Sequence, residues 1–148
     1  MKAIDRTIDL AAPVDAVWKV LTDIESYSDW NPFLSIDRTP AAIGDRLLVT
    51  VRPGRRTMTF RPTVTAFRPE REMSWVGRFL VRGLADGTHT FALSPLPNGD
   101  TRFSQREVFT GLLVPFLGAV LRDTDAGFAA MNTALAARLQ ALACRTAR

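Results

Sequence analysis

The chain has few of the residues that cross-link proteins or bind metals. Its 148 residues include one cysteine, Cys144, and one histidine, His89. A single cysteine excludes an internal disulfide and fits a reducing compartment. One histidine and one cysteine far apart in the sequence do not supply the ligands of a zinc site. We therefore expect neither a bound metal nor a cofactor.

Long apolar segments are also missing. The residues Met1–Arg6 carry charges where a signal peptide has an apolar centre. The longest apolar run, Gly111–Leu121, is too short to span a bilayer. We expect a cytoplasmic protein without an integral membrane segment. A segment that is apolar nearly all round is either fully buried or docks on another surface.

The basic residues do not form a nucleic-acid-binding pattern. The net charge is +4, and one basic cluster stands out, Arg52-Pro53-Gly54-Arg55-Arg56. Its Pro-Gly centre is typical of a solvated turn. No basic stripe interleaved with aromatic residues follows it, so we expect no nucleic-acid partner.

The composition indicates one globular domain that begins with a strand and two short helices. The chain is 47% hydrophobic and 23% charged, which is ordinary for a globular domain of this length. Alternating apolar residues predict a first strand that ends at Leu10. Pro13 suits the first position of a following helix. Pro32 disfavours a helical Asn31, so a second short helix should end near Trp30.

From Phe33 to Thr110 apolar and polar residues alternate, which is the two-residue period of β-strands. Short turns between the segments predict an antiparallel meander. The expected strands are Phe33–Asp37, Asp45–Arg52, Thr57–Phe67, Glu72–Phe79, Gly87–Leu96 and Asp100–Thr110.

The register of the last hairpin follows from its two apolar faces. A two-residue loop, Asn98-Gly99, would place Leu93 beside Ser104 and mix the faces. A three-residue loop that includes Pro97 pairs Leu96 with Asp100 and keeps the faces together, with Gly99 as the left-handed residue of a bulge. That register places His89 beside Glu107, on the apolar side of the sheet.

A long amphipathic helix is predicted from Thr124 to Cys144. One apolar stripe recurs at helical spacing and has Asn132 at its edge; it consists of Phe128, Met131, Leu135, Leu139 and Leu142. The opposite face is rich in alanine. We expect the stripe to pack on the sheet, and the residues Arg122–Asp125 to separate the helix from the apolar run before it.

This order of elements resembles the SRPBCC superfamily, and most closely its polyketide cyclase/dehydrase-like branch. The segments that carry the resemblance are Ala12–Trp18, Leu21–Asp23, Trp30–Phe33, Gly87–Phe91 and Phe109–Pro115. The resemblance implies a single domain over residues 1–148 with an α+β helix-grip fold. In this fold a curved antiparallel sheet of about seven strands wraps around a long C-terminal helix.

The resemblance also implies a ligand cavity between the sheet and the C-terminal helix. The apolar run Gly111–Leu121 would lie at its mouth, as a lid over the ligand or, alternatively, as a site of transient membrane docking. His89 and Glu107 would lie in it. The ligand-binding residues would be Trp30, Phe33, Trp75, Phe79, Phe91, Gln105, Phe109, Phe128, Met131 and Asn132. Each has an alternative interpretation: the aromatic residues as core, the His89–Glu107 pair as a buried structural pair, and Asn132 as a locally bonded amide.

Three functions remain open. The first is binding or carriage of an apolar molecule, either ring-containing and polyketide-like or acyl, without catalysis. The second is a cyclase or dehydratase, hence a lyase or isomerase, with His89 as general acid or base and Glu107 orienting its ring. In that case Gln105 or Asn132 would hold a substrate carbonyl. The third is a protein-interaction module or homodimer that uses the alanine face of the long helix.

Overall fold

The computed structural model describes residues 1–79 and 81–147, and the side chain of Phe79 lies outside the described part. The chain begins with β1 (Lys2–Leu10), α1 (Val14–Thr22), the 3-10 turn η1 (Ile24–Ser26) and α2 (Tyr27–Trp30). Seven further strands follow: β2 (Leu34–Ile36), β3 (Val49–Val51), β4 (Met58–Phe60), β5 (Thr63–Arg68), β6 (Glu72–Phe79), β7 (Ala85–Pro95) and β8 (Thr101–Thr110). The 3-10 turn η2 (Val114–Phe116) leads into the long helix α3 (Gly118–Thr146).

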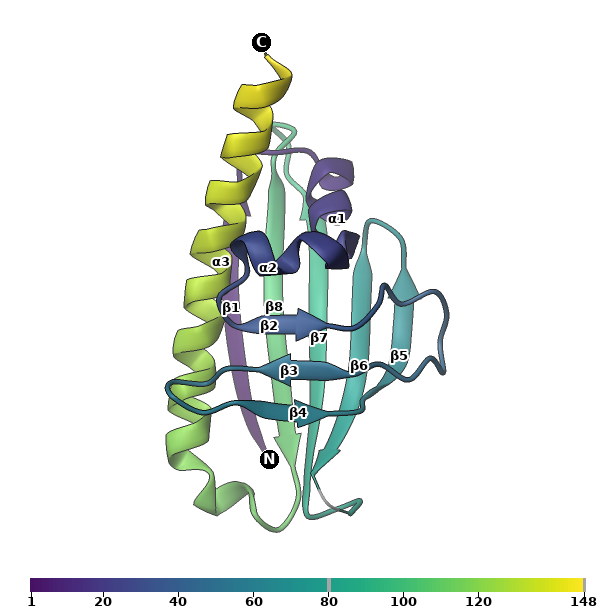
Figure 1. Cartoon of the computed structure of the whole chain (residues 1–148), viewed down its shortest axis with the longest axis vertical. Coiled ribbons are helices and arrows are strands. Elements are labelled where there is room, and N and C mark those ends of the chain that lie inside the picture. Colours follow the sequence, from purple (N-terminus) through teal and green to yellow (C-terminus); the bar gives the residue numbers. More distant parts are fainter. Residues whose placement is uncertain (80, 148) are drawn as a thin grey trace.

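The strands form two antiparallel sheets. Five long strands lie in the order β1-β8-β7-β6-β5, and β2, β3 and β4 make a separate three-stranded sheet. Figure 1 shows the short strands crossing in front of the long ones, with α3 running beside β1. One face of the large sheet is therefore covered by α3 together with the small sheet. This is the α+β helix-grip arrangement that the resemblance implied, but the described residues form sheets of five and three strands where one curved sheet of about seven strands was expected.

Two predicted element boundaries are wrong. The strand expected over Thr57–Phe67 is broken at Arg61-Pro62 into β4 and β5, because proline has no N–H to donate to a ladder. Likewise, only Val49–Val51 of the expected strand Asp45–Arg52 pairs continuously, and Arg46 forms an isolated bridge with Thr63.

The long helix also begins earlier than predicted. Residues Arg122–Asp125 belong to α3 and do not separate it from the preceding run. Their charges are accommodated at the helix surface, where Asp123 pairs with Arg56 and Asp125 pairs with Arg6 of β1. None of these residues has the restricted backbone of proline or the entropic cost of glycine, so nothing in the segment ends the helix.

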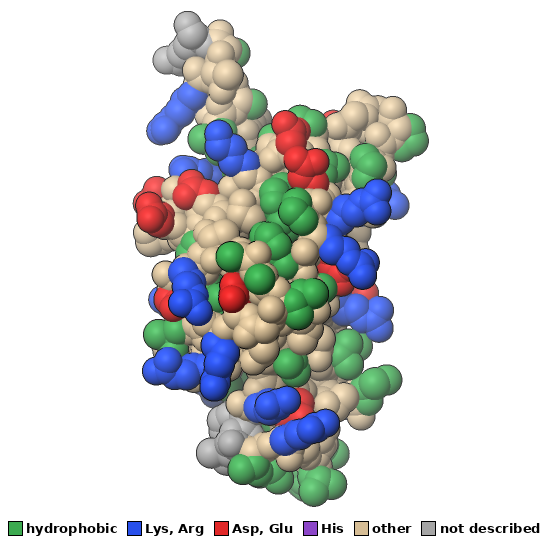
Figure 2. All heavy atoms as spheres, turned by 90° about the vertical axis from the view of Figure 1, so that its right-hand side faces the viewer, with side chains coloured by type: hydrophobic (Ala, Val, Ile, Leu, Met, Phe, Trp, Pro, Cys, Tyr) green, Lys and Arg blue, Asp and Glu red, His purple; other side chains and the backbone are tan. Residues whose placement is uncertain are grey.

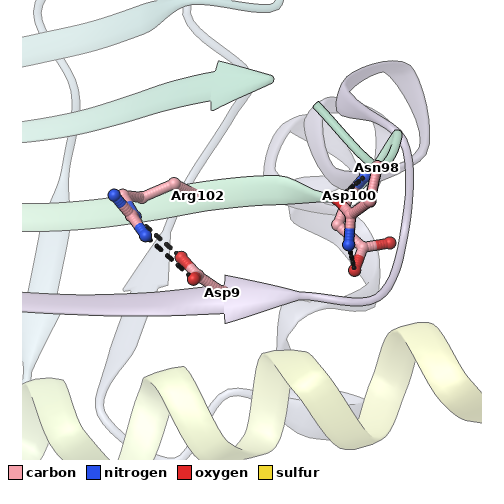
Figure 3. Close-up of polar contacts among 4 residues, drawn as sticks. All are labelled: Asp9, Asn98, Asp100 and Arg102. Atoms are coloured by element: carbon pink, nitrogen blue, oxygen red, sulfur yellow. Dashed lines mark hydrogen bonds and ion pairs between the residues drawn. The ribbon is translucent and has the colours of Figure 1, made fainter. Parts of the chain in front are cut away.

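The β7–β8 hairpin has the predicted register. Leu93 lies opposite Phe103, and His89 lies opposite Glu107. The loop is closed by the amide of Leu96, which donates to the carbonyl of Asp100 over 2.8 Å, and Gly99 has a φ of 87°. Figure 3 shows the loop end, where Asn98 bonds Asp100, and the neighbouring pair of Arg102 with Asp9 of β1.

The apolar stripe of α3 forms one side of the core. Phe128, Met131 and Leu135 are at most 1% exposed, and Leu139 is 7% exposed. The alanine face points away, with Ala126, Ala130, Ala137 and Ala141 exposed. In the described residues, no helix is long and apolar enough to cross a membrane.

Candidate functional site

A small apolar hollow lies between the two sheets and α3. It has a volume of about 90 Å³, and we call it the chamber. The small sheet and its loops supply most of one wall, the large sheet supplies the opposite wall, and α3 closes the side. The lining residues are Phe33, Leu34, Val49, Val51, Pro53, Met58, Phe60, Trp75, His89, Glu107, Phe109, Val120, Thr124 and Phe128.

A wider hollow adjoins the chamber, and we call it the groove. Its volume is about 470 Å³. It shares Met58, Phe60, Glu107, Phe109 and Val120 with the chamber, so the two spaces are neighbours separated by these side chains. Its other lining residues are Thr57, Thr59, Gly77, Arg78, Ala85, Gly87 and Leu117.

The two ionisable groups of the chamber form a hydrogen-bonded pair. Nδ1 of His89 lies 2.7 Å from Oε2 of Glu107. The side chains are 6% and 15% exposed, so both groups are largely removed from water. Because the carboxylate accepts a hydrogen bond from the Nδ1–H group, it fixes the orientation of the imidazole ring and directs the chemistry of the ring to Nε2.

Aromatic rings surround His89. Trp75 is stacked on the imidazole with centroids 4.9 Å apart and planes 15° apart. Phe91 and Phe128 meet it edge-on, with centroids 4.6 Å and 5.2 Å from that of the imidazole. Nε2 has no hydrogen-bond partner among the described residues, although it is buried. Such a nitrogen is costly to leave unpaired, so it is the group of the chamber most in need of a ligand atom.

The structure brings half of the sequence-predicted residues to the two hollows. Phe33, Trp75, Phe109 and Phe128 line the chamber together with His89 and Glu107. Phe91 and Met131 are fully buried behind this wall. Trp30 packs edge-on against Tyr27, with centroids 5.2 Å apart, and lines neither hollow. Phe79 was also predicted to bind a ligand, but its side chain lies outside the described part of the structure.

The two predicted amides bond each other across the core. Nε2 of Gln105 on β8 donates to Oδ1 of Asn132 on α3 over 2.5 Å, and it lies 3.4 Å from the carbonyl oxygen of Phe128. Both residues are at most 5% exposed, and neither lines the chamber or the groove. Local bonding of Asn132 was one of the alternatives left open by the sequence.

Sequence reasoning missed the contribution of the small sheet and of the start of α3. Val49, Val51, Met58 and Phe60 line the chamber. Their alternation predicted strands, but not which face would meet a ligand, because that depends on how the small sheet crosses the large one. Val120 was assigned to the separate apolar run and not to the long helix.

The residues that line the two hollows include two charged side chains, Glu107 and Arg78. Arg78 is the one Lys or Arg among the residues that line the groove, and it is exposed. Figure 2 shows the face beyond β5, where Lys and Arg side chains are scattered among hydrophobic ones. In the described residues no cluster of three or more His, Cys, Asp or Glu side chains could hold a metal ion.

Comparison with known proteins identifies a family. The model of the family "Polyketide cyclase / dehydrase and lipid transport" matches residues 1–146. No curated protein matches the chain.

Solved structures share the fold at low sequence identity. The Zhui aromatase/cyclase from Streptomyces sp. R1128 is 15% identical with a TM-score of 0.75, covering 94% of this chain and 93% of that one. A hypothetical protein from Helicobacter pylori has the same identity and TM-score, over 93% and 87% of the two chains. A START superfamily protein from Mycobacterium smegmatis is 18% identical with a TM-score of 0.69, over 95% and 98%. These likenesses establish the fold alone.

Proposed function

The chain belongs to the polyketide cyclase / dehydrase and lipid transport family, and from that premise we propose that it binds and carries an apolar small molecule in the chamber and groove. The observation that carries the proposal is the adjoining pair of apolar hollows, which share five lining residues. A buried site lined by apolar and aromatic side chains with a few polar groups is typical of small-molecule binding.

The volumes indicate where such a ligand would lie. Small-molecule sites enclose roughly 300–1,000 Å³. The groove, at about 470 Å³, falls within this range, whereas the chamber, at about 90 Å³, does not. The ligand body therefore belongs in the groove, and one edge or substituent reaches past Phe60 and Glu107 toward His89.

Blocking the groove tests the proposal. Val120 lines both hollows, so Val120→Trp should fill their junction. Ala130 lies on the exposed face of the same helix, so Ala130→Trp is the matched control. Binding of 2-naphthol and decanoic acid is measured by calorimetry, and native mass spectrometry of the freshly purified full chain detects a retained ligand.

The proposal expects binding in the wild type and in Ala130→Trp, with a loss of about tenfold or more in Val120→Trp. Equal binding by Val120→Trp would place the ligand elsewhere. A clean ligand-free mass, together with no binding of either probe, would overturn the proposal.

A second candidate function is catalysis by His89. The observation that favours it is the difference between the two ring nitrogens of His89. Nδ1 is hydrogen-bonded to Glu107, whereas Nε2 is buried and has no partner among the described residues. A neutral imidazole oriented in this way can take a proton at Nε2. In a dehydration Nε2 would remove the proton beside a carbonyl, and the imidazolium so formed would deliver that proton to the β-hydroxyl, which leaves as water as the carbon–carbon double bond forms.

His89→Gln separates the two candidates. An enzyme that dehydrates a β-hydroxy ketone with an aromatic ring should lose turnover in this variant while it still binds the ketone. A carrier should show no turnover in either form and only a changed affinity. Equal turnover by wild type and His89→Gln would exclude the catalytic role of His89.

A further inference from the structure

Two loops at one end of the molecule expose a cluster of large apolar side chains. Among the described residues five large hydrophobic side chains are exposed, and three of them belong to these loops: Val81 at 59%, Leu112 at 77% and Phe116 at 82%. Val81 lies between β6 and β7, and the other two lie between β8 and α3. Single exposed apolar residues are ordinary, but a cluster of them indicates a contact surface. We call these three side chains the apolar tip.

The two loops are joined along their backbones. The amides of Leu112 and Leu113 donate to the carbonyls of Gly83 and Leu84, over 3.2 Å and 2.9 Å. Gly111 has a φ of 125°, and a Cβ atom there would overlap the carbonyl oxygen of Leu84. Figure 1 shows both loops at the lower end of the molecule, away from the C-terminus. The apolar tip is therefore one structural unit, whose loops are held together while its side chains remain exposed.

The same loops border the groove on their inner side. Val114 is 2% exposed, so the 3-10 turn η2 is anchored in the interior between the exposed Leu112 and Phe116. Leu117, the residue after Phe116, lines the groove, and so does Ala85 at the end of the other loop. One end of the groove therefore lies directly behind the apolar tip.

The side chains around the tip are mainly basic. Residues 78–86 and 111–122 contain three arginines and one acidic residue, Asp86. Arg82 in the β6–β7 loop and Arg122 in the first turns of α3 are exposed, and neither forms an ion pair among the described residues. Figure 2 shows Lys and Arg side chains just above hydrophobic ones at the lower end of the molecule. The charge around the tip therefore complements an anionic surface.

From this arrangement we infer that the apolar tip docks on a bilayer that contains anionic lipids, with its three side chains among the acyl chains and Arg82 and Arg122 at the headgroups. A stable protein interface takes about 800 Å² from each partner, which is far more than three projecting side chains supply. A bilayer accepts apolar side chains at its interface, and anionic headgroups attract nearby Lys and Arg. Docking would bring the end of the groove to the lipid surface, but it does not depend on a ligand in the groove.

Vesicle flotation of the full chain tests the role of charge. The vesicles consist of phosphatidylcholine alone or of an equal mixture of phosphatidylcholine and phosphatidylserine. The wild type should bind the mixed vesicles more tightly. Each basic side chain near an anionic surface contributes about fivefold, so Arg82→Gln with Arg122→Gln should weaken binding to the mixed vesicles by about tenfold or more. Arg71→Gln, exposed in the β5–β6 turn at the other end of β6, is the matched control and should bind like wild type.

A second variant tests the apolar side chains. Leu112→Ser with Phe116→Ser changes exposed residues, so the fold should persist in circular dichroism, and binding to both kinds of vesicle should fall about tenfold or more. Ile43→Ser, which is 69% exposed outside the two loops, is the matched control and should bind like wild type.

Three results would overturn the inference. The first is no binding of the wild type to the mixed vesicles, and the second is equal binding by the wild type and the double serine variant. The third is a wild-type dimer in analytical ultracentrifugation that is lost in the double serine variant, without vesicle binding by either; the tip would then be a contact between copies of the chain.

Discussion

Gly127 of α3 lies directly against the ring of Phe33, with no space between them for a side chain. That ring in turn meets Phe128 edge-on, with centroids 5.6 Å apart. The contact explains a glycine within a long helix, where alanine would otherwise be preferred by about 1 kcal/mol. It also holds Phe33 at the wall of the chamber.

Gly127→Ala should therefore destabilise the protein, although it raises helix propensity. A Cβ atom would overlap the Phe33 ring, and overpacking of a core costs about 1–3 kcal/mol. Urea unfolding measures the change in the free energy of unfolding. Gly118→Ala in the same helix should be neutral or slightly stabilising. Adding Phe33→Leu to Gly127→Ala should recover part of the loss, and a stabilised Gly127→Ala variant would contradict the described contact.

The bond between Gln105 and Asn132 should contribute to stability and not to ligand affinity. Asn132→Ala removes the acceptor of a buried amide and should lower the free energy of unfolding by about 1–3 kcal/mol. The double variant Gln105→Met with Asn132→Leu removes both polar groups and should recover much of that loss. Calorimetry with 2-naphthol should show affinity within about twofold of wild type, since neither residue lines the hollows. A larger loss of affinity in the folded double variant would place one of the amides at the ligand.

His89 and Glu107 should be energetically coupled. Their bond is short and largely buried, so a double-mutant cycle with His89→Gln and Glu107→Gln should give a coupling energy of about 1–3 kcal/mol in urea unfolding. A matched cycle on the exposed pair Arg68–Glu72 should give much less. Additive effects in the buried pair would mean that the bond contributes nothing in solution.

The strand register that pairs His89 with Glu107 could be predicted, because it follows from the alternation of side chains between the two faces of the sheet. Side chains alternate along both strands, so only one parity of pairing keeps Leu93 and Phe103 on the same face. Gly99 then supplied the loop that this parity requires. The α3 stripe was predictable for a similar reason, since Phe128, Met131 and Leu135 share one helix face.

The parts that were not predicted depend on contacts between distant segments. Phe60 belongs to a strand of three residues, and its position at the junction of the two hollows is set by how the small sheet crosses the large one. From the sequence alone, Gly77 and Gly87 are glycines that weaken their strands. The structure shows that the ring of Phe60 lies against Gly77 and the carboxylate of Glu107 lies against Gly87. Gln105 and Asn132 were placed on the correct faces, but their mutual bond depends on the depth at which α3 packs.

The segment between β8 and α3 should respond to a ligand. Leu112 and Phe116 are 77% and 82% exposed, while Leu117 lines the groove. Two amides, of Leu112 and Leu113, donate to the carbonyls of Gly83 and Leu84. If the segment is a lid, hydrogen exchange of residues 112–117 should be fast in the free protein and slower with 2-naphthol, with β7 and β8 unchanged. Exchange as slow as that of β8 without ligand, and unaffected by it, would contradict a lid.

The pair of Arg6 with Asp125 should make part of the stability dependent on pH. Nε of Arg6 lies 2.6 Å from Oδ1 of Asp125, which joins β1 to the segment of α3 that was expected to be a separator. The hydrogen bond from Arg6, and secondarily its charge, hold the pKa of Asp125 below the ordinary value of 3.8. The folded state therefore binds this proton less readily than the unfolded state, and stability rises with pH across the acidic range.

The contribution of this pair should be fully present above the ordinary pKa and lost as the pH falls through the lower folded-state pKa. Asp125→Asn should accordingly unfold at lower urea concentration than wild type at pH 7, and the two midpoints should converge near pH 2. The difference at pH 7 should be small and should shrink in 1 M salt, because the two side chains are 46% and 38% exposed. Ala130→Ser, on the exposed face of the same helix, should show no such convergence. A midpoint difference that persists unchanged at pH 2 would show that Asp125 acts through its shape and not through its charge.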